Sequence, residues 1–194
     1  MSQIGEIKKL SDTRFLNFYE FEAVHRDGTS APYFVASRAK KIEQLKAISH
    51  ENKPDGVILF GVYGEKKDRV VLVRQYRYAA AQAMLEVPAG KIEHDGESPD
   101  YCAARELEEE AGVTASEILP LGYTYTSPGF CSERIYLYLA RGLQKGKQHL
   151  DDDEFMNIEY YTPKEMEDLI DQNEITDAKT IAAFEKARKY LPGL

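Results

Sequence analysis

The chain has 194 residues, 43% of them hydrophobic, which fits one large domain or one ordinary domain with a small addition. A run of about 18 apolar residues, as a membrane-spanning helix needs, is absent from the sequence, and no apolar segment of a secretory signal follows the early lysines. The net charge of −8 argues against a nucleic-acid binder, and two cysteines make no disulfide framework, so we expect a cytoplasmic protein.

The first 50 residues differ from the rest of the chain in their sequence pattern, which predicts strands and a connection but no helix. Segments 15–24 and 32–37 are rich in aromatic and β-branched residues, which is typical of strands. An Asp-Gly pair between the two segments favours a hairpin turn. The polar, lysine-rich stretch 38–55 is predicted to be a connection.

From residue 56 onward the chain is predicted to contain both strands and helices. Strands are predicted at 56–63, 69–74, 84–88, 118–126, 134–140 and 155–161, and helices at 98–111, 162–171 and 177–190. The first helix has the clearest ends, because Ser98 suits the N-cap, Pro99 the first helical position and Gly112 the C-terminal stop. This mixed pattern predicts an α/β fold.

The segment 90–113 carries a concentration of negative charge. It holds eight acidic and two basic side chains. Glu106, Glu109 and Glu110 lie at positions i, i+3 and i+4, which places them on one face of the predicted helix. Like charges placed in this way repel each other unless cations offset them.

Two explanations fit this acidic helix face. It could be a solvated face, with Arg105 paired to a neighbouring glutamate. It could instead be a divalent-cation site, because Mg²⁺ prefers hard oxygen ligands. Small residues one turn before Glu106 would let the backbone at Ala89 and Gly90 approach the carboxylates, so that a carbonyl there adds one more oxygen ligand.

The segment GKIEHDGESPDYCAARELEEEAGV resembles the Nudix box, in which a glycine, a glutamate and a run containing Arg-Glu and Glu-Glu follow at fixed spacings. The matching residues are Glu97, Arg105, Glu106, Leu107, Glu109, Glu110, Gly112 and Val113. One departure lies in the loop, where six residues instead of five separate Gly90 from Glu97. With so many fixed positions matched, the chain is identified as a member of the Nudix family.

Motifs outside the box are similar to the ADP-ribose pyrophosphatase branch of this family. They are VLVRQYRYAA, LEVPAG, SPGFCSER, LDDDEF and ITDAKTI. The resemblance covers most of the chain and implies a Nudix α/β/α sandwich on a mixed sheet at 51–194. It also implies a small N-terminal antiparallel β domain at 1–50, which pairs two chains into a homodimer and contributes to the substrate site.

The resemblance implies a metal site on the box helix. Glu106 and Glu110 would be the first ligands, with Glu109 close behind and the carbonyl of Ala89 as a backbone ligand. The metal would be Mg²⁺, with Mn²⁺ as an alternative. Four further residues would have structural roles in the motif, with Glu97 and Arg105 forming an ion pair that orients the ligands. These residues are Gly90, Glu97, Arg105 and Gly112.

A later acidic loop matches the position from which the family supplies its proton-accepting carboxylate. Glu154 aligns best with a metal-binding or base glutamate, and Asp152 is the second candidate, whereas an ordinary acidic turn is the other explanation. Arg77 and Arg38 are candidates for holding phosphates, because a guanidinium offers paired donors, and a surface ion pair is the alternative for Arg77. Glu133 resembles a substrate-loop position, and its alternative is an ion pair with a neighbouring arginine.

The resemblance implies hydrolysis of the pyrophosphate bond of a nucleoside diphosphate sugar, with ADP-ribose giving AMP and ribose 5-phosphate. GDP-mannose or UDP-glucose as substrate, or a nucleotide sensor that does not hydrolyse, are the alternatives. No nucleic acid or membrane partner is expected. A purine would need an aromatic partner, but the aromatic residues of the two N-terminal strands are treated as core. They are Tyr19, Phe21, Tyr33 and Phe34.

Overall fold

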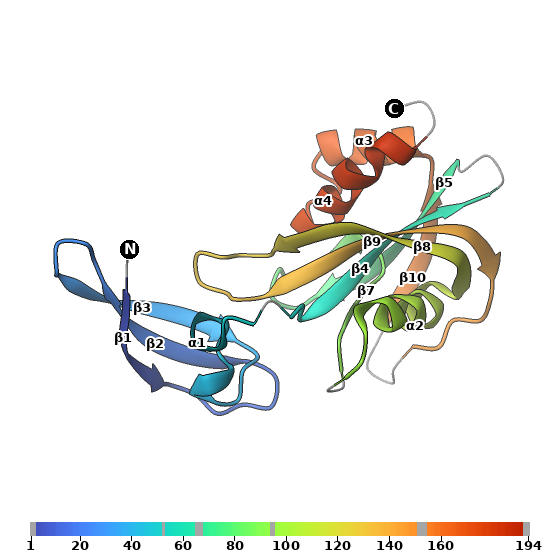
Figure 1. Cartoon of the computed structure of the whole chain (residues 1–194). Coiled ribbons are helices and arrows are strands. Elements are labelled where there is room, and N and C mark those ends of the chain that lie inside the picture. Colours follow the sequence, from blue (N-terminus) through green and yellow to red (C-terminus); the bar gives the residue numbers. More distant parts are fainter. Residues whose placement is uncertain (1–2, 52, 65–67, 94–95, 151–154, 192–194) are drawn as a thin grey trace. The chain divides into compact units, whose positions relative to one another are not determined.

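The computed structural model describes residues 3–51, 53–64, 68–93, 96–150 and 155–191 (Figure 1). The chain divides into two compact units. Unit 1 comprises residues 1–55 and 125–134, and unit 2 comprises residues 56–124 and 135–194. The structure therefore adds a later segment of the chain to the N-terminal unit, and the division at residue 50 stays a prediction.

Unit 1 is built on a three-stranded antiparallel sheet in the order β1-β2-β3. Its elements are β1 (Gln3–Lys9), β2 (Asn17–Val24), β3 (Ser30–Ser37), the short 3-10 helix η1 (Ile42–Gln44) and α1 (Lys46–Ser49). Gly28 has a φ of +85° in the hairpin between β2 and β3, which explains the glycine in this turn. The sequence analysis missed β1, because this strand is mostly exposed and lacks an apolar alternation.

A small core holds unit 1 together. Tyr19, Phe21, Val35 and Leu45 are buried and pack on one another. The expectation that the four strand aromatics are all core is half wrong, because Tyr33 is 42% exposed and its neighbour in sequence is also exposed. Alternate residues of a strand face opposite sides, which explains the exposure of Phe34 beside the inward-facing Val35, whereas Tyr33 lies on the face of Val35 and is covered only in part.

Unit 2 is built on a seven-stranded mixed sheet in which β10-β5-β4-β9-β8 form the main order, with β6 pairing β5 and β7 pairing β4. The strands are β4 (Gly56–Tyr63), β5 (Arg69–Arg77), β6 (Gln82–Glu86), β7 (Ala89–Lys91), β8 (Val113–Tyr125), β9 (Arg134–Lys145) and β10 (Met156–Tyr161). The central strand β4 runs parallel to β9 and antiparallel to β5. Its burial along almost its whole length is typical of a strand covered on both faces.

Helices cover both faces of this sheet, as Figure 1 shows. The helix α2 (Pro99–Ala111) lies on one face, and α3 (Pro163–Asp171) and α4 (Ala178–Ala187) lie on the other, where the 3-10 helix η2 (Arg188–Tyr190) follows α4. Alternate residues of β4 enter the two cores: Val57 packs with α2, and Ile58 packs with α3 and α4. The expected α/β/α sandwich on a mixed sheet is confirmed.

The ends of α2 follow from the sequence signals that predicted them. The Ser98 side chain accepts a hydrogen bond from the backbone N–H of Tyr101, Pro99 is the first helical residue, and Gly112 ends the helix with a φ of +61°. The Thr162 capping box begins α3 in the same way. Among the described residues, the helices are too short or too polar to cross a membrane.

Cys102 is buried in the core on the α2 side of the sheet, so we expect its thiol to react slowly with alkylating agents. Burial raises the pKa of its thiol to about 12, and the charges of Glu106 and Glu97 add to this effect. Because the thiolate is the reactive species, iodoacetamide at about pH 8 should modify the half-buried Cys131 and leave Cys102 unmodified in the native protein. Peptide mass spectrometry checks this, with guanidinium-unfolded protein as the control in which both thiols react. Equal labelling of the two thiols in the native protein would contradict it.

Candidate metal and phosphate site

Two carboxylates of α2 are buried against the backbone that precedes the helix. Glu106 is 8% exposed and Glu110 is 4% exposed. The backbone N–H of Ala89 donates a hydrogen bond of 2.7 Å to Oε2 of Glu110. Burying a carboxylate is costly unless polar groups or cations satisfy it, so the Ala89 amide is part of what keeps Glu110 in place.

Gly90 allows the second carboxylate to lie directly against this backbone. A Cβ atom added at Gly90 would lie 1.7 Å from the carboxyl carbon of Glu106, a distance at which two atoms overlap. Antiparallel pairing of β7 with β4 holds this segment in register, with Gly90 opposite Val57. The glycine is therefore required by close approach and not by an unusual backbone angle.

Arg105 is the cation that offsets the acidic face of α2. Its guanidinium lies 3.1 Å from Glu97, 2.9 Å from Glu106 and 2.7 Å from Glu109, and it also donates to the carbonyl of Lys91 at 3.2 Å. Burial opposes its charge, but the hydrogen bond that Arg105 donates to Glu97 and the charge of Glu106 outweigh burial, so the pKa of Arg105 is raised. This cluster ties the loop before α2 to the helix.

Glu97 has a further contact in the loop, where it accepts the backbone N–H of Glu93 at 2.9 Å. The side chain of Glu109 differs from those of Glu106 and Glu110 because it is 39% exposed and lies beside Arg105. Its role as a metal ligand stays a prediction.

The donors at this site have the chemistry of a hard-cation site. Two buried carboxylates lie beside the Ala89–Gly90 backbone, and carboxylate and carbonyl oxygens are the ligands that Mg²⁺ prefers. In the described part of the chain, however, no three acidic, histidine or cysteine side chains are arranged to hold a metal ion. The predicted contributors Asp152 and Glu154 lie outside the described residues.

A second ion pair lies at the ends of β5 and β6. Arg77 donates from Nε and Nη2 to the two carboxylate oxygens of Glu86, each at 2.7 Å. Glu86 is 1% exposed, whereas the Arg77 side chain is 39% exposed. The hydrogen bonds that Arg77 donates to Glu86 raise the pKa of Arg77, and the charges of Glu110 and Asp177 act in the same direction.

Sequence analysis missed Glu86, although one signal was present. It is an acidic residue in the middle of the apolar LEVPAG motif, and a buried carboxylate in such a setting needs a partner. The charge of Glu110 on α2 adds to the rise in the pKa of Arg77, and Glu86 fixes one side of the Arg77 guanidinium.

The other two predicted substrate residues meet in unit 1. Nη2 of Arg38 donates to Oε1 of Glu133 at 2.9 Å. The segment that carries Glu133 is attached to β3 through an isolated bridge between Ala36 and Cys131. Glu133 thus pairs with Arg38 across 95 positions in sequence, which the sequence alone does not indicate.

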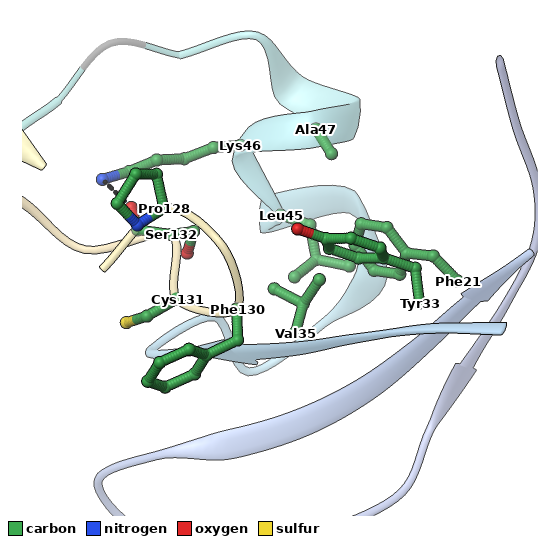
Figure 2. Close-up of a pocket in the computed structure, with 10 residues that line it drawn as sticks. All are labelled: Phe21, Tyr33, Val35, Leu45, Lys46, Ala47, Pro128, Phe130, Cys131 and Ser132. Atoms are coloured by element: carbon green, nitrogen blue, oxygen red, sulfur yellow. Dashed lines mark hydrogen bonds between the residues drawn. The ribbon is translucent and has the colours of Figure 1, made fainter. Parts of the chain in front are cut away.

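Unit 1 also contains a small apolar pocket of about 150 Å³, shown in Figure 2. Aromatic and aliphatic side chains form most of its wall, and Lys46 and Ser132 supply polar atoms at its edge. The lining residues are Phe21, Tyr33, Val35, Leu45, Lys46, Ala47, Pro128, Phe130, Cys131 and Ser132. The hydroxyl of Tyr33 donates to the carbonyl of Gly129, which holds the loop that closes one side of the pocket.

Comparison with known proteins identifies the family. A family model described as the NUDIX domain matches residues 52–184. The chain is 39% identical over 147 residues to an ADP-ribose pyrophosphatase of Bacillus subtilis (strain 168), which covers 75% of this chain and 76% of that protein. It is 40% identical over 134 residues to a methanol dehydrogenase activator of Bacillus methanolicus, which covers 68% of this chain and 71% of that protein.

The fold agrees with this assignment. The crystal structure of an ADP compounds hydrolase superposes with a TM-score of 0.81 at 20% sequence identity, covering 99% of this chain and 95% of that one. At this level of identity the likeness concerns the fold. The matched domain, the curated relatives and the acidic helix beside a glycine together show that the chain belongs to the Nudix family of hydrolases.

Proposed function

We propose that this Nudix hydrolase cleaves the pyrophosphate bond of a nucleoside diphosphate sugar, and that its preferred substrate is ADP-ribose, which gives AMP and ribose 5-phosphate. The observation that carries the proposal is the convergence of Glu106 and Glu110 on the Ala89–Gly90 backbone. The similarity to the Bacillus subtilis ADP-ribose pyrophosphatase supports the choice of substrate class.

The donors fit a Mg²⁺ cofactor, with Mn²⁺ as an alternative. Glu106, Glu110 and the Ala89 carbonyl would hold it, with Glu109 and Glu154 as further ligands. When bound, the metal would lower the pKa of a water molecule that it holds and would neutralise negative charge on the phosphate oxygens. Arg105 keeps the glutamates of the helix oriented, because it contacts Glu106 and Glu109 at once.

The remaining steps belong to side chains of this chain. Arg77 would bind a phosphate, because Glu86 occupies its Nε and Nη2 and leaves Nη1 on the other side of the guanidinium for an acceptor. A carboxylate, Glu154 first and Asp152 second, would take the proton of the attacking water. A phosphorus–oxygen bond forms to that water as the bridging oxygen leaves on the second phosphate, so the two products are monophosphates.

Arg38 and Glu133, which form an ion pair within unit 1, remain candidate substrate-binding residues. We also propose that the protein is cytoplasmic and a homodimer that pairs through its N-terminal region, taken as 1–50, with the hydrolase domain at 51–194. A monomer mass that does not change with concentration in light scattering would exclude the dimer.

Two alternatives change the outcome of an assay. If the preferred substrate is another sugar nucleotide, GDP-mannose or UDP-glucose, the reaction is the same and only the base and sugar that the enzyme recognises differ. A sensor that binds nucleotides without hydrolysis would keep only the binding. The Bacillus methanolicus relative, whose name describes activation of another enzyme, is the reason to test binding as well as turnover.

Glu110→Gln removes a buried negative charge and keeps the shape of the side chain. Turnover of ADP-ribose with Mg²⁺ should fall by a factor of about 100 or more, because a metal ligand or its charge is lost. Release of the nucleoside monophosphate by the wild type is compared for ADP-ribose, which gives AMP, for GDP-mannose, which gives GMP, for UDP-glucose, which gives UMP, and for a nucleoside triphosphate, each with and without EDTA.

Glu108→Gln is the matched control, since Glu108 is an exposed glutamate on the same helix. It should keep wild-type turnover. Equal rates for Glu110→Gln and Glu108→Gln would exclude the proposed metal site, and binding of ADP-ribose without turnover by the wild type would favour the sensor.

Gly90→Ala adds a methyl group where the Glu106 carboxyl lies. The side chain of Glu106 must move, so we expect the Mg²⁺ concentration for half-maximal activity to rise about tenfold or more. A titration of activity against Mg²⁺ measures this, and thermal unfolding verifies that the protein is folded.

Glu106→Gln and the double variant test whether both changes act on one contact. If they do, the double variant is no worse than the poorer single variant. Independent, multiplicative losses would show that Gly90 matters for another reason.

A further inference from the structure

The first turn of α4 forms a buried polar cluster, which we call the α4 clamp and define as Asp177, Lys179 and Thr180. Asp177 caps the helix and accepts the backbone N–H of Thr180 at 2.9 Å and its hydroxyl at 2.8 Å. Thr180 is fully buried and Asp177 is 8% exposed. These residues come from the ITDAKTI motif, to which the proposed function assigns no role.

The α4 clamp contacts the chain at the end of β6. The hydroxyl oxygen of Thr180 accepts the backbone N–H of Val87 at 3.1 Å. Nζ of Lys179 pairs with Asp177 and lies 3.8 Å from Oε2 of Glu86. The clamp therefore contacts both the backbone and the carboxylate at the point where the chain passes from β6 to the Ala89–Gly90 segment of β7.

The charges in this region are balanced in pairs. Two nearly buried carboxylates, Glu86 and Asp177, face two cations, Arg77 and Lys179. Burial alone would raise the pKa of Asp177, but the charge and hydrogen bond of Lys179 and the hydrogen bonds of Thr180 outweigh it and lower the pKa. Without Lys179, Arg77 would be the only cation of this group left to two carboxylates.

An arginine shared in this way would not keep one orientation. Nε and Nη2 of Arg77 donate to the two carboxylate oxygens of Glu86, and the Arg77 side chain as a whole is 39% exposed. The charges of Asp177 and of Glu110 both contribute to raising the pKa of Arg77, after the hydrogen bonds that Arg77 donates to Glu86. Loss of Lys179 would increase the attraction between Arg77 and Asp177 at the expense of the Glu86 pair.

We propose that Lys179 is a positioning residue that, acting through Glu86, holds the guanidinium of Arg77 in the orientation that binds a substrate phosphate. The identity of the substrate rests on the proposed function, whereas the contacts of Glu86 with Lys179 and Arg77 do not. Lys179 touches neither the carboxylates of α2 nor the substrate in this scheme. It makes α4, a helix remote in sequence from the Nudix box, part of substrate recognition.

Steady-state kinetics tests the effect on the substrate that the wild type hydrolyses best. Lys179→Met keeps most of the side-chain length and removes the charge. KM should rise about tenfold while kcat stays within about twofold, since the interaction is one of binding. Lys179→Arg should restore KM to within about threefold of the wild type. Lys186→Met is the control, because Lys186 is exposed on the last turn of α4.

A double-variant cycle separates positioning from general stability. In an Arg77→Ala background, Lys179→Met should raise KM no further, because the residue through which it acts is gone. A full, multiplicative effect in that background would overturn the proposal. So would a KM for Lys179→Met equal to that of the wild type.

Two readouts are independent of hydrolysis. In the ¹⁵N spectrum, the Nε–H signal of Arg77, assigned by its loss in Arg77→Ala, should be sharp in the wild type and in Lys186→Met and broadened in Lys179→Met. Calorimetric affinity for inorganic pyrophosphate in EDTA should fall about fivefold or more in Lys179→Met only. If the wild type hydrolyses no sugar nucleotide, the proposed function fails while these two measurements still decide the role of Lys179, and an unchanged signal and affinity would overturn it.

Discussion

The structure of unit 2 depends on keeping negatively charged side chains buried beside a backbone that would otherwise repel or exclude them. A carboxylate removed from water must be satisfied by donors or cations. Glu110 uses the amide of Ala89, Glu106 lies against the open side of Gly90, and Arg105 pairs with the glutamates around it. The contacts of both buried glutamates require that the Ala89–Gly90 segment and α2 be held at a fixed separation.

The mixed sheet supplies that fixed separation. Pairing of β7 with β4 sets the register of the Ala89–Gly90 segment, and the α2-side core fixes the helix on the sheet. From the opposite face, the first turn of α4 holds the end of β6 through Thr180 and Val87. The short segment between β6 and α2 is thus held from both faces of the sandwich, and a site on it is rigid because the sheet is rigid.

Sequence reasoning succeeded where the signal is local. Ser98 and Gly112 specify the two ends of α2 through hydrogen bonds and backbone angles within the same helix, and the spacing of the glutamates places them on one face. It failed where the signal is weak or distant. The strand β7 has three residues, too few for a periodicity, and β1 is exposed and polar. No local pattern can show that Glu86 pairs with Arg77, or which of the aromatic residues of β2 and β3 face inward, because tertiary packing decides both.

Unit 1 is discontinuous in sequence, since residues 125–134 complete a unit that otherwise ends at residue 55. The β2-β3 hairpin can form as soon as it is synthesised, because its contacts are local. The Arg38–Glu133 pair and the bridge from Ala36 to Cys131 join residues 95 positions apart, so they form only after most strands of unit 2 have been synthesised. The first part of the chain to be translated is therefore among the last to be finished, and the N-terminal 55 residues made alone would expose the apolar surface that the later segment covers.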